Sequence, residues 1–332
     1  MKFGPLPLSE ATGAVLAHSV ALPETRLRKG LVLTQDHVAM LRAEGHETVV
    51  AAVLDAEDVD ENTAAAALAR ALVPDPDAAK LRIESAFTGR VNILADGPGV
   101  VTLDEARLRA LNLVHPMITL ATVPPFQQMT DGGMVGTVKI ISYGVPKSAL
   151  EAACRAGTDA MALAPPEIKS AGLVVTEIPG GAGEKGVAAI EARLDALDIS
   201  LDAVVSVPHE QSRICEALKA VPGDMVLILT GSATSDPHDV APEAVRQAGG
   251  QVTRFGMPVD PGNLLFLGEL GQRPIIGLPG CARSPALNGA DWVLSRVACG
   301  LTVSHADIAG MGVGGLLKEI PTRPHPRRKR RS

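Results

Sequence analysis

The chain has 332 residues, 46% of them hydrophobic and 2% aromatic, and its formal net charge is −6. This length predicts two or three domains with a sizeable core, and no apolar stretch reaches the roughly 18 residues that cross a bilayer. The acidic charge and the low aromatic content argue against a nucleic-acid groove. The N-terminus has no signal-peptide pattern, so we expect a cytoplasmic protein that binds neither nucleic acid nor membrane.

The first unit, residues 1–80, is predicted to be a small α/β unit. Ser9 is placed where a helix N-cap would lie. Residues 35–44 follow a capping threonine and precede a glycine, which predicts a helix, and residues 47–54 (ETVVAAVL) predict a strand. An alanine-rich helix is expected over residues 60–73, where a proline ends it.

The second unit, residues 81–160, is predicted to be rich in β-strand. Short β-branched runs between residues 86 and 145 are punctuated by glycine and proline, as in GRVNILADGPGVVTL and MVGTVKIISYGVP. A helix over residues 147–157 leads out of this unit. The two units together predict a smaller N-terminal α+β region.

The third unit, residues 161–305, alternates strand and helix. The predicted strands are residues 171–178, 201–207, 224–230, 251–259, 263–270 and 274–279, and the predicted helices are residues 185–197, 210–221, 242–250 and 285–300. Strands joined by crossover helices imply a mostly parallel sheet with helices on both faces. The fold class is therefore α/β, with a C-terminal three-layer domain whose ligands are expected at the carboxyl ends of the strands.

The first loop at that edge is residues 178–186 (IPGGAGEKG). Gly180, Gly181 and Gly183 remove Cβ atoms that would keep an anion from the backbone, and Lys185 stands near the start of the next helix. The loop is a candidate phosphate-binding segment. A merely flexible turn is the alternative, because the loop matches neither a Walker motif nor a dinucleotide fingerprint.

The second loop follows the strand over residues 224–230 and combines backbone donors, small hydroxyls and two acids. Its candidate binding residues are Thr230, Gly231, Ser232, Ala233 and Thr234. Asp236 and Asp239, three residues apart, would hold a divalent ion against a phosphate or bind the guanidine-like edge of a pterin. Asp239 also stands where a helix N-cap would lie, so a capping role remains open.

The third loop is the turn GLPGCARSP, and its candidate binding residues are Pro279, Gly280, Cys281, Arg283 and Ser284. Arg283 would make a paired contact to a phosphate or carboxylate. Pro285 is expected to start the last helix, whose N-terminus would lower the pKa of the Cys281 thiol and make it a soft ligand. An ordinary buried thiol is the alternative for Cys281.

The runs DMVLILTGSATSDPHDVAPEAVRQAGG and LPGCARSP resemble the molybdopterin-binding domain shared by molybdopterin adenylyltransferases and molybdopterin molybdotransferases. LSEATGAVLAHSV and FTGRVNILADGPGVVTLDEARLRALN are similar to the leading region of molybdotransferase-like proteins. RFGMPVDPGNLLFLG and GMGVGGLLKEIPTRP resemble a bacterial subgroup often fused to a molybdenum cofactor nucleotidyltransferase domain. The likeness covers most of the chain and is most specific over residues 171–300.

The resemblance implies that the second loop cradles the terminal phosphate and pterin of molybdopterin and that the other two loops complete the walls. It implies molybdopterin or the finished molybdenum cofactor as ligand, with Mg²⁺ positioned by the catalytic candidates Asp236 and Asp239. It also implies a homo-oligomer, and a nucleotidyltransferase or an apo-molybdoenzyme as partner.

The sequence departs from the catalytic members at three places. The TGGTG-type loop reads TGSAT here, and Cys281 replaces the family's asparagine, bringing a thiol that would meet molybdenum, copper or the dithiolene. Adenylyltransferases carry an acid at the position of His209, and histidine does not replace a carboxylate toward Mg²⁺. His209 is expected to hydrogen-bond the cofactor or its oxo groups, or to cap the following helix.

Two classes of function remain open. The first is a binding protein that holds molybdopterin for cofactor biosynthesis, insertion or hand-over, which His209 and the altered loop favour. The second is an active adenylyltransferase or molybdotransferase, which the two retained acids favour. A generic nucleotide-binding α/β protein is a third and poorer interpretation.

The C-terminal extension, residues 306–332, ends in a basic segment. Residues 321–332 carry six Lys/Arg and no acid, which predicts a solvated, disordered tail, a docking segment for an acidic partner or a truncated link to a further domain. The four cysteines form no CxxC pair, so neither a zinc site nor a disulfide framework is indicated.

Overall fold

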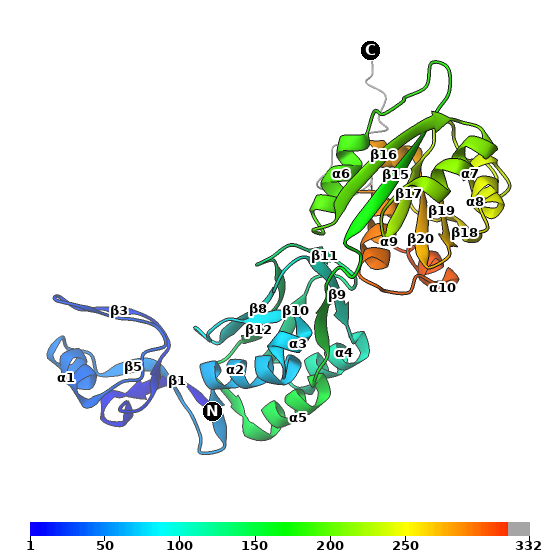
Figure 1. Cartoon of the computed structure of the whole chain (residues 1–332). Helices are drawn as coiled ribbons and strands as arrows, with labels where there is room; N and C mark the ends of the chain where they lie inside the picture. Colours follow the sequence, from blue (N-terminus) through cyan, green and yellow to red (C-terminus); the bar gives the residue numbers. More distant parts are fainter. Residues whose placement is uncertain (318–332) are drawn as a thin grey trace, which may run out of the picture. The chain divides into compact units, whose positions relative to one another are not determined.

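The computed structural model describes residues 1–317, in which the chain divides into two compact units (Figure 1). The first comprises Met1–Asp96, Val101–Pro125 and Asp131–Leu163, and the second comprises Gly97–Val100, Phe126–Thr130 and the chain from Ala164 onward. The expected basic tail, residues 321–332, lies outside the described residues. Within residues 1–317 no helix is both long and apolar enough to cross a membrane.

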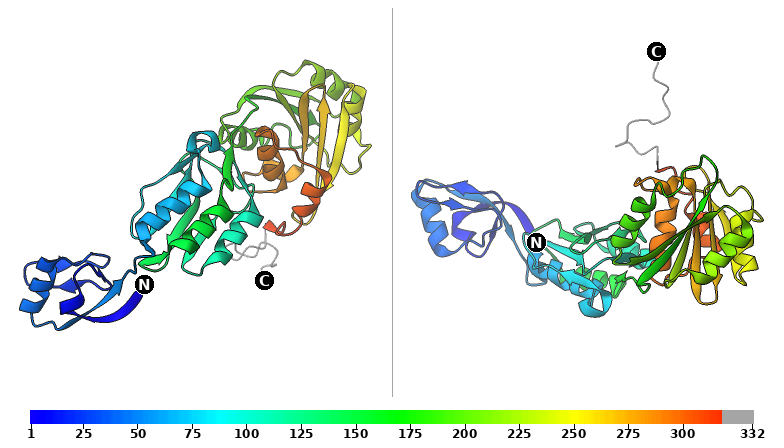
Figure 2. Two further views of the ribbon diagram at one scale, coloured as in Figure 1. Left: turned by 90° about the horizontal axis from the view of Figure 1, so that it is seen from below. Right: turned by 45° about the horizontal axis from the view of Figure 1, so that its top comes forward.

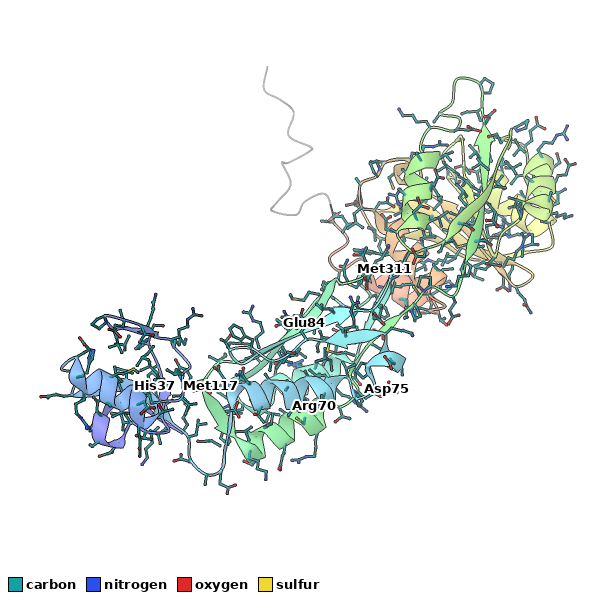
Figure 3. The ribbon with its side chains drawn as sticks, turned by 60° about the vertical axis from the view of Figure 1, so that its left-hand side comes forward. His37, Arg70, Asp75, Glu84, Met117 and Met311 are labelled. Atoms are coloured by element: carbon teal, nitrogen blue, oxygen red, sulfur yellow. The ribbon has the colours of Figure 1, made fainter. Side chains whose placement is uncertain are left out.

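The N-terminal part of the first unit is built on a three-stranded sheet in the order β1-β5-β2. Its elements are β1 (Lys2–Pro7), η1 (Leu8–Glu10), β2 (Val15–Leu16), β3 (Val20–Ala21), β4 (Arg26–Leu27), α1 (Gln35–Ala43) and β5 (Thr48–Val53). Thr34 and His37 form a capping box at the start of α1. Figure 3 labels His37 on this helix. Ser9 does not cap an α-helix, because it lies inside the short 3₁₀ helix η1. In η1 the Ala11 N–H donates to the Leu8 carbonyl.

The rest of the first unit packs three helices with a four-stranded sheet, β10-β12-β8-β7. The elements from Asp58 to Ala164 are β6 (Asp58–Asp60), α2 (Glu61–Leu72), α3 (Pro76–Ala79), β7 (Leu81–Ile83), β8 (Arg90–Ala95), β9 (Gly99–Leu103), α4 (Glu105–Val114), β10 (Ile118–Thr122), β11 (Gln128–Met129), β12 (Met134–Ile140), β13 (Gly144–Pro146), α5 (Lys147–Gly157) and β14 (Met161–Ala164). The expectation of short strands over 86–145 missed α4, which Asp104 caps and whose Leu108 and Leu111 are buried.

The second unit is a three-layer α/β domain (Figure 2). Its main elements are β15 (Ser170–Glu177), α6 (Val187–Asp195), β16 (Ser200–Pro208), α7 (Gln211–Ala220), β17 (Met225–Leu229), α8 (Val240–Gln247), β18 (Gln251–Met257), β19 (Asn263–Leu270), β20 (Arg273–Leu278), η2 (Gly280–Arg283), α9 (Gly289–Ala298) and α10 (His305–Gly310). The strand order is β16-β15-β17-β20-β19-β18. The first four strands run parallel, and β19 pairs antiparallel with both β20 and β18. The predicted α/β class with a mostly parallel sheet is confirmed.

The two faces of this sheet are covered by different helices. Leu173 and Val175 of β15 pack in one apolar cluster with residues of α6 and α9, whereas Val174 packs in another with residues of α7 and α8. This alternation follows from the two-residue period of a strand, because successive side chains point to opposite faces. Burial of the apolar side chains on both faces anchors the sheet and fixes where its strands end.

Candidate functional site

The carboxyl ends of β16, β15, β17 and β20 meet at one edge of the sheet. The registers pair Glu177 with Pro208, Val175 with Leu229, and Leu229 with Leu278, so the segments that follow these strands begin side by side. The chain leaves β15 toward α6 on one face and leaves the neighbouring β17 toward α8 on the other. Connections that diverge in this way mark the switch point at which α/β sheets bind ligands.

A buried threonine links three segments at this edge. The Thr176 hydroxyl oxygen lies 2.8 Å from His209 Nδ1 and accepts a 2.8 Å hydrogen bond from the Gly231 N–H. Thr176 is fully buried, and the Glu177 carbonyl accepts the His209 N–H at 2.9 Å. His209 and Gly231 were predicted from the sequence as site residues, but Thr176 was not. The signal that could have found Thr176 is a hydroxyl residue near the end of an otherwise apolar strand.

Gly231 is required by the close approach of the strands. A Cβ atom there would lie 2.5 Å from the Thr176 carbonyl oxygen. Ser232 and Thr234, which stand where the related TGGTG motif has glycine, have no positive φ. Their substitution therefore brings no left-handed backbone strain to the loop. Thr230 and Thr234 are buried, so this loop is anchored at both ends of the motif.

Arg283 ties the three loops together. Its guanidinium donates to the carbonyls of Gly183 and Lys185 in the first loop and to the Thr230 carbonyl in the second. Burial lowers the pKa of this guanidinium from its usual value. Gly186 allows the approach, since its φ is 101° and a Cβ atom would lie 2.7 Å from the Arg283 Cα. The Arg283 guanidinium, which was expected to pair with an anion, thus donates to three backbone carbonyls in this structure.

The first loop turns sharply before α6. Gly180 and Gly183 have φ of 72° and 50°, while Gly181 does not have a positive φ. Lys185 is exposed at the end of the loop, and no side chain within the described residues caps α6. An exposed ammonium beside the switch point, at a helix start that no side chain caps, is suited to an anionic ligand.

The two acids of the second loop organise its backbone. Asp239 caps α8, with Oδ1 accepting the Val240 N–H at 2.7 Å and Oδ2 accepting the Ser235 N–H at 2.8 Å. Asp236 Oδ1 accepts the His238 N–H at 2.7 Å. The capping role that the sequence left open for Asp239 is therefore present. Across residues 1–317 no group of three or more His, Cys, Asp or Glu side chains is arranged to hold a metal ion.

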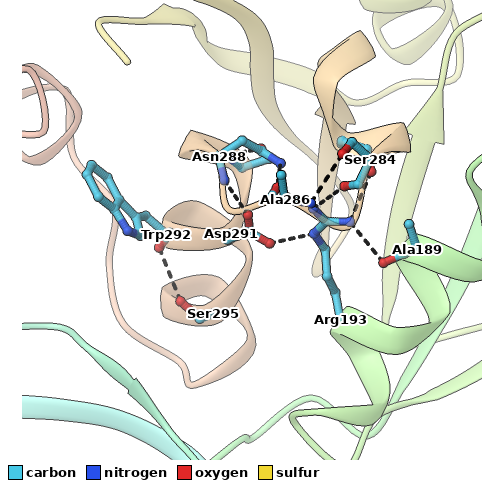
Figure 4. Close-up of polar contacts among 10 residues, drawn as sticks. Ala189, Arg193, Ser284, Ala286, Asn288, Asp291, Trp292 and Ser295 are labelled. Atoms are coloured by element: carbon cyan, nitrogen blue, oxygen red, sulfur yellow. Dashed lines mark hydrogen bonds and ion pairs between the residues drawn. The ribbon is translucent and has the colours of Figure 1, made fainter. Parts of the chain in front are cut away.

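The third loop is held by a second arginine, Arg193 of α6. Its guanidinium donates to the carbonyls of Ala282, Ser284 and Ala286 in the turn and pairs with Asp291 (Figure 4). The side chains of Arg193 and Asp291 are only 10% and 15% exposed, so this ion pair is largely shielded from solvent.

The start of the helix that follows the third loop was predicted wrongly. α9 begins at Gly289 rather than at Pro285, because Asn288 and Asp291 form a capping box there. Pro279 is buried, whereas Gly280, Cys281 and Ser284 are exposed around η2. Cys281 thus stands in a short 3₁₀ turn several residues before the helix, and the helix N-terminus expected to lower its pKa lies farther along the chain. The alternative of a buried thiol does not hold for Cys281.

A doubly wound α/β domain with three loops converging at its switch point defines a class of small-ligand binding domains. Residues 176–296 match the family model described as a probable molybdopterin binding domain, and residues 5–53 match a domain of unknown function (DUF8806). A search of curated proteins gave no match. The match to the probable molybdopterin binding domain runs from Thr176 into α9, so this similarity lies in the second unit and covers all three loops.

Proposed function

We propose that the loop edge formed by residues 178–186, 230–239 and 279–284, together with His209, holds molybdopterin or the finished cofactor for insertion or hand-over. The exposed ammonium of Lys185, just before α6, suits the phosphate. The exposed hydroxyl of Ser232, the thiol of Cys281 and the His209 ring supply polar contacts for the pterin and dithiolene.

The geometry of Asp239 carries this proposal. Both carboxylate oxygens accept backbone N–H groups, one from α8 and one from the loop itself. A carboxylate used in this way shapes the loop, and turning it toward Mg²⁺ would break one or both of those hydrogen bonds. With histidine rather than an acid at residue 209, the edge supports binding better than adenylyl transfer.

The alternative, an active adenylyltransferase or molybdotransferase, rests on Asp236. Its side chain is exposed, and Oδ1 alone accepts the neighbouring His238 N–H. Asp236 would then supply an oxygen to Mg²⁺ in the presence of a nucleotide. A nucleotidyltransferase or an apo-molybdoenzyme is the partner that a holding function calls for, and a homo-oligomer is part of the same proposal.

The deciding experiment is anaerobic calorimetric titration of the full chain with molybdopterin, with and without Mg-ATP, followed by mass spectrometry of the recovered pterin. We expect tight binding that Mg-ATP does not change and recovery of unmodified pterin. Recovery of adenylylated or molybdenum-loaded pterin would make the protein an enzyme. Binding of adenosine nucleotides without binding of pterin would support the generic nucleotide-binding interpretation.

Two pairs of variants locate the ligand. Lys185→Ala should weaken binding about tenfold by removing a charge-assisted contact, whereas Lys219→Ala, an exposed lysine at the far end of α7, should not. Asp239→Ser keeps a capping hydroxyl and removes the carboxylate. We expect it to lose less binding than Asp239→Ala, which removes both acceptor oxygens and so both the cap and the loop contact. Equal losses in the serine and alanine variants would favour a metal-binding carboxylate.

A further inference from the structure

The contacts of Thr176 define which nitrogen of His209 carries the proton. The Thr176 oxygen already accepts the Gly231 N–H, and the hydroxyl has one proton to donate. Among the contacts of the described residues, the acceptor within reach of that proton is His209 Nδ1, at 2.8 Å. If Nδ1 carried the proton instead, the hydroxyl proton of a fully buried threonine would have no partner, at a cost typical of an unsatisfied buried donor.

We propose that Thr176 fixes neutral His209 as the Nε2–H tautomer, so that the ring presents a hydrogen-bond donor to an oxygen of the bound ligand. Thr176 is then a positioning residue, and His209 is the residue that selects an acceptor, such as a phosphate oxygen, a pterin carbonyl or a metal-oxo oxygen. This assignment of the ligand atom rests on the proposed function, whereas the tautomer rests on the protein alone.

The surroundings of the ring support this role. The backbone N–H of His209 donates to the Glu177 carbonyl, and the ring nitrogen Nδ1 is in hydrogen-bond contact with the Thr176 hydroxyl. Both the backbone and one side of the ring are therefore anchored to β15. The ring is half-buried, which leaves its other nitrogen within reach of a ligand. In this tautomer Nε2 has no lone pair to offer a metal ion, so His209 acts toward the ligand as a donor and not as a metal ligand.

The tautomer is tested without any ligand. The full chain, labelled with ¹⁵N in its eight histidines, is studied by long-range ¹H–¹⁵N NMR at a pH where histidine is neutral, and His209 is assigned by comparison with His209→Gln. We expect a protonated-type shift for Nε2 and an unprotonated-type shift for Nδ1. Thr176→Ser should keep this pattern and Thr176→Val should lose it. A protonated Nδ1 in the unaltered protein, or an unchanged pattern in Thr176→Val, would overturn the assignment.

The donor role is tested by two amide variants with molybdopterin as the probe. The glutamine amide nitrogen falls near the position of His Nε2, whereas the asparagine amide nitrogen falls near His Nδ1. His209→Gln should therefore retain most of the affinity, and His209→Asn should lose about tenfold or more. Equal affinities for both variants and the unaltered protein would overturn the donor role. If the unaltered protein has the expected tautomer but does not bind molybdopterin, the proposed function fails and the tautomer stands.

Discussion

At the residue scale, the candidate site is shaped by side chains that bind the backbone. Arg283 donates to three loop carbonyls, Asp239 accepts from two N–H groups, and Thr176 joins a histidine to a glycine. Side chains that form these hydrogen bonds within the protein fix the shape of the loops before a ligand binds. The residues left exposed at the edge, notably Lys185 and Cys281, are then those expected to contact the ligand.

The accessibility of Cys281 gives a direct prediction for the site. Cys281 is exposed, Cys154 is half-buried, and Cys215 and Cys299 are buried. Burial also raises the pKa of the Cys154 thiol and raises that of Cys299 to about 11, which suppresses their thiolates near neutral pH. Under limiting maleimide at pH 7, peptide mass spectrometry should show Cys281 modified first.

Ligand protection is the control for that prediction. Molybdopterin should slow the modification of Cys281 and leave that of Cys154 unchanged, because Cys154 lies on α5 in the first unit. If Cys281→Ala leaves both cofactor affinity and transfer unaltered, the thiol is not part of the site. Protection of both cysteines to the same extent would point to a general stabilisation instead.

At the element scale, the ends of helices and strands are set by a few polar contacts. Arg193 connects α6 to the turn before α9 and to Asp291 in the first turn of α9. Removing one partner of a shielded ion pair leaves the other uncompensated. We therefore expect Arg193→Met to lower the free energy of unfolding by about 3 kcal/mol, measured by urea denaturation.

An exposed arginine provides the matched control. Arg213 and Glu216 form an i,i+3 pair on α7 with side chains 57% and 68% exposed. Arg213→Met should change the free energy of unfolding by less than about 0.5 kcal/mol. Equal losses in the two variants would mean that the contacts of Arg193 with the turn and α9 are not what stabilises the domain.

The amino end of β15 predicts a dependence of stability on pH. Asp224, just before β17, accepts hydrogen bonds from the Lys169 N–H and from the N–H and hydroxyl of Ser170, and these lower the pKa of its carboxyl. A carboxyl whose pKa is lower in the folded state stabilises the fold above its unfolded pKa. That contribution is lost as the pH falls through the folded value.

The test of this prediction is the unfolding free energy of Asp224→Asn across the acid range. The variant should be less stable than the unaltered protein at neutral pH, and the difference should shrink as the pH falls below about 4, where the unfolded carboxyl protonates. A difference that stays constant into acid would show that ionised Asp224 does not stabilise the strand ends.

At the scale of the whole molecule, the second unit is assembled from segments far apart in the sequence. Phe126 belongs to it although the chain on both sides of Phe126–Thr130 belongs to the first unit. The Arg296 guanidinium carbon lies 4.0 Å from the centre of the Phe126 ring, and burial lowers the pKa of that guanidinium. The aromatic face thus partly compensates a desolvated cation.

Phe126→Ala should therefore destabilise the second unit by about 1 kcal/mol. The single tryptophan, Trp292, lies on α9 in that unit, so its fluorescence follows the unfolding of the second unit alone. Phe87→Ala, which removes a ring 77% exposed in the first unit, is the control and should leave the Trp292 transition in place. A shift of the transition in both variants would contradict the assignment.

The sequence by itself determined the local elements and the kind of sheet. Strand and helix periods placed every strand of the six-stranded sheet, and Gly and Asp signals placed the loops between them. The helix α4 was missed because its sequence is largely polar and is flanked by strands, so it resembles a loop. Its helical character depends on burial of Leu108 and Leu111 in the core, which the local sequence does not show. The start of α9 was misplaced because a proline was read as the helix start when the capping box lies three residues later.

Only the tertiary structure decided what the site residues do. Spacing along the chain cannot show that Thr176, His209 and Gly231 meet, since the 33 and 55 residues that separate Thr176 from the other two are brought together by strand order. Nor can it show that Arg283 is bound to carbonyls or that Asp239 uses both oxygens on the backbone. Local pattern fixes secondary structure because its forces act within a few residues, whereas hydrogen-bond partners across a sheet depend on how the strands are ordered.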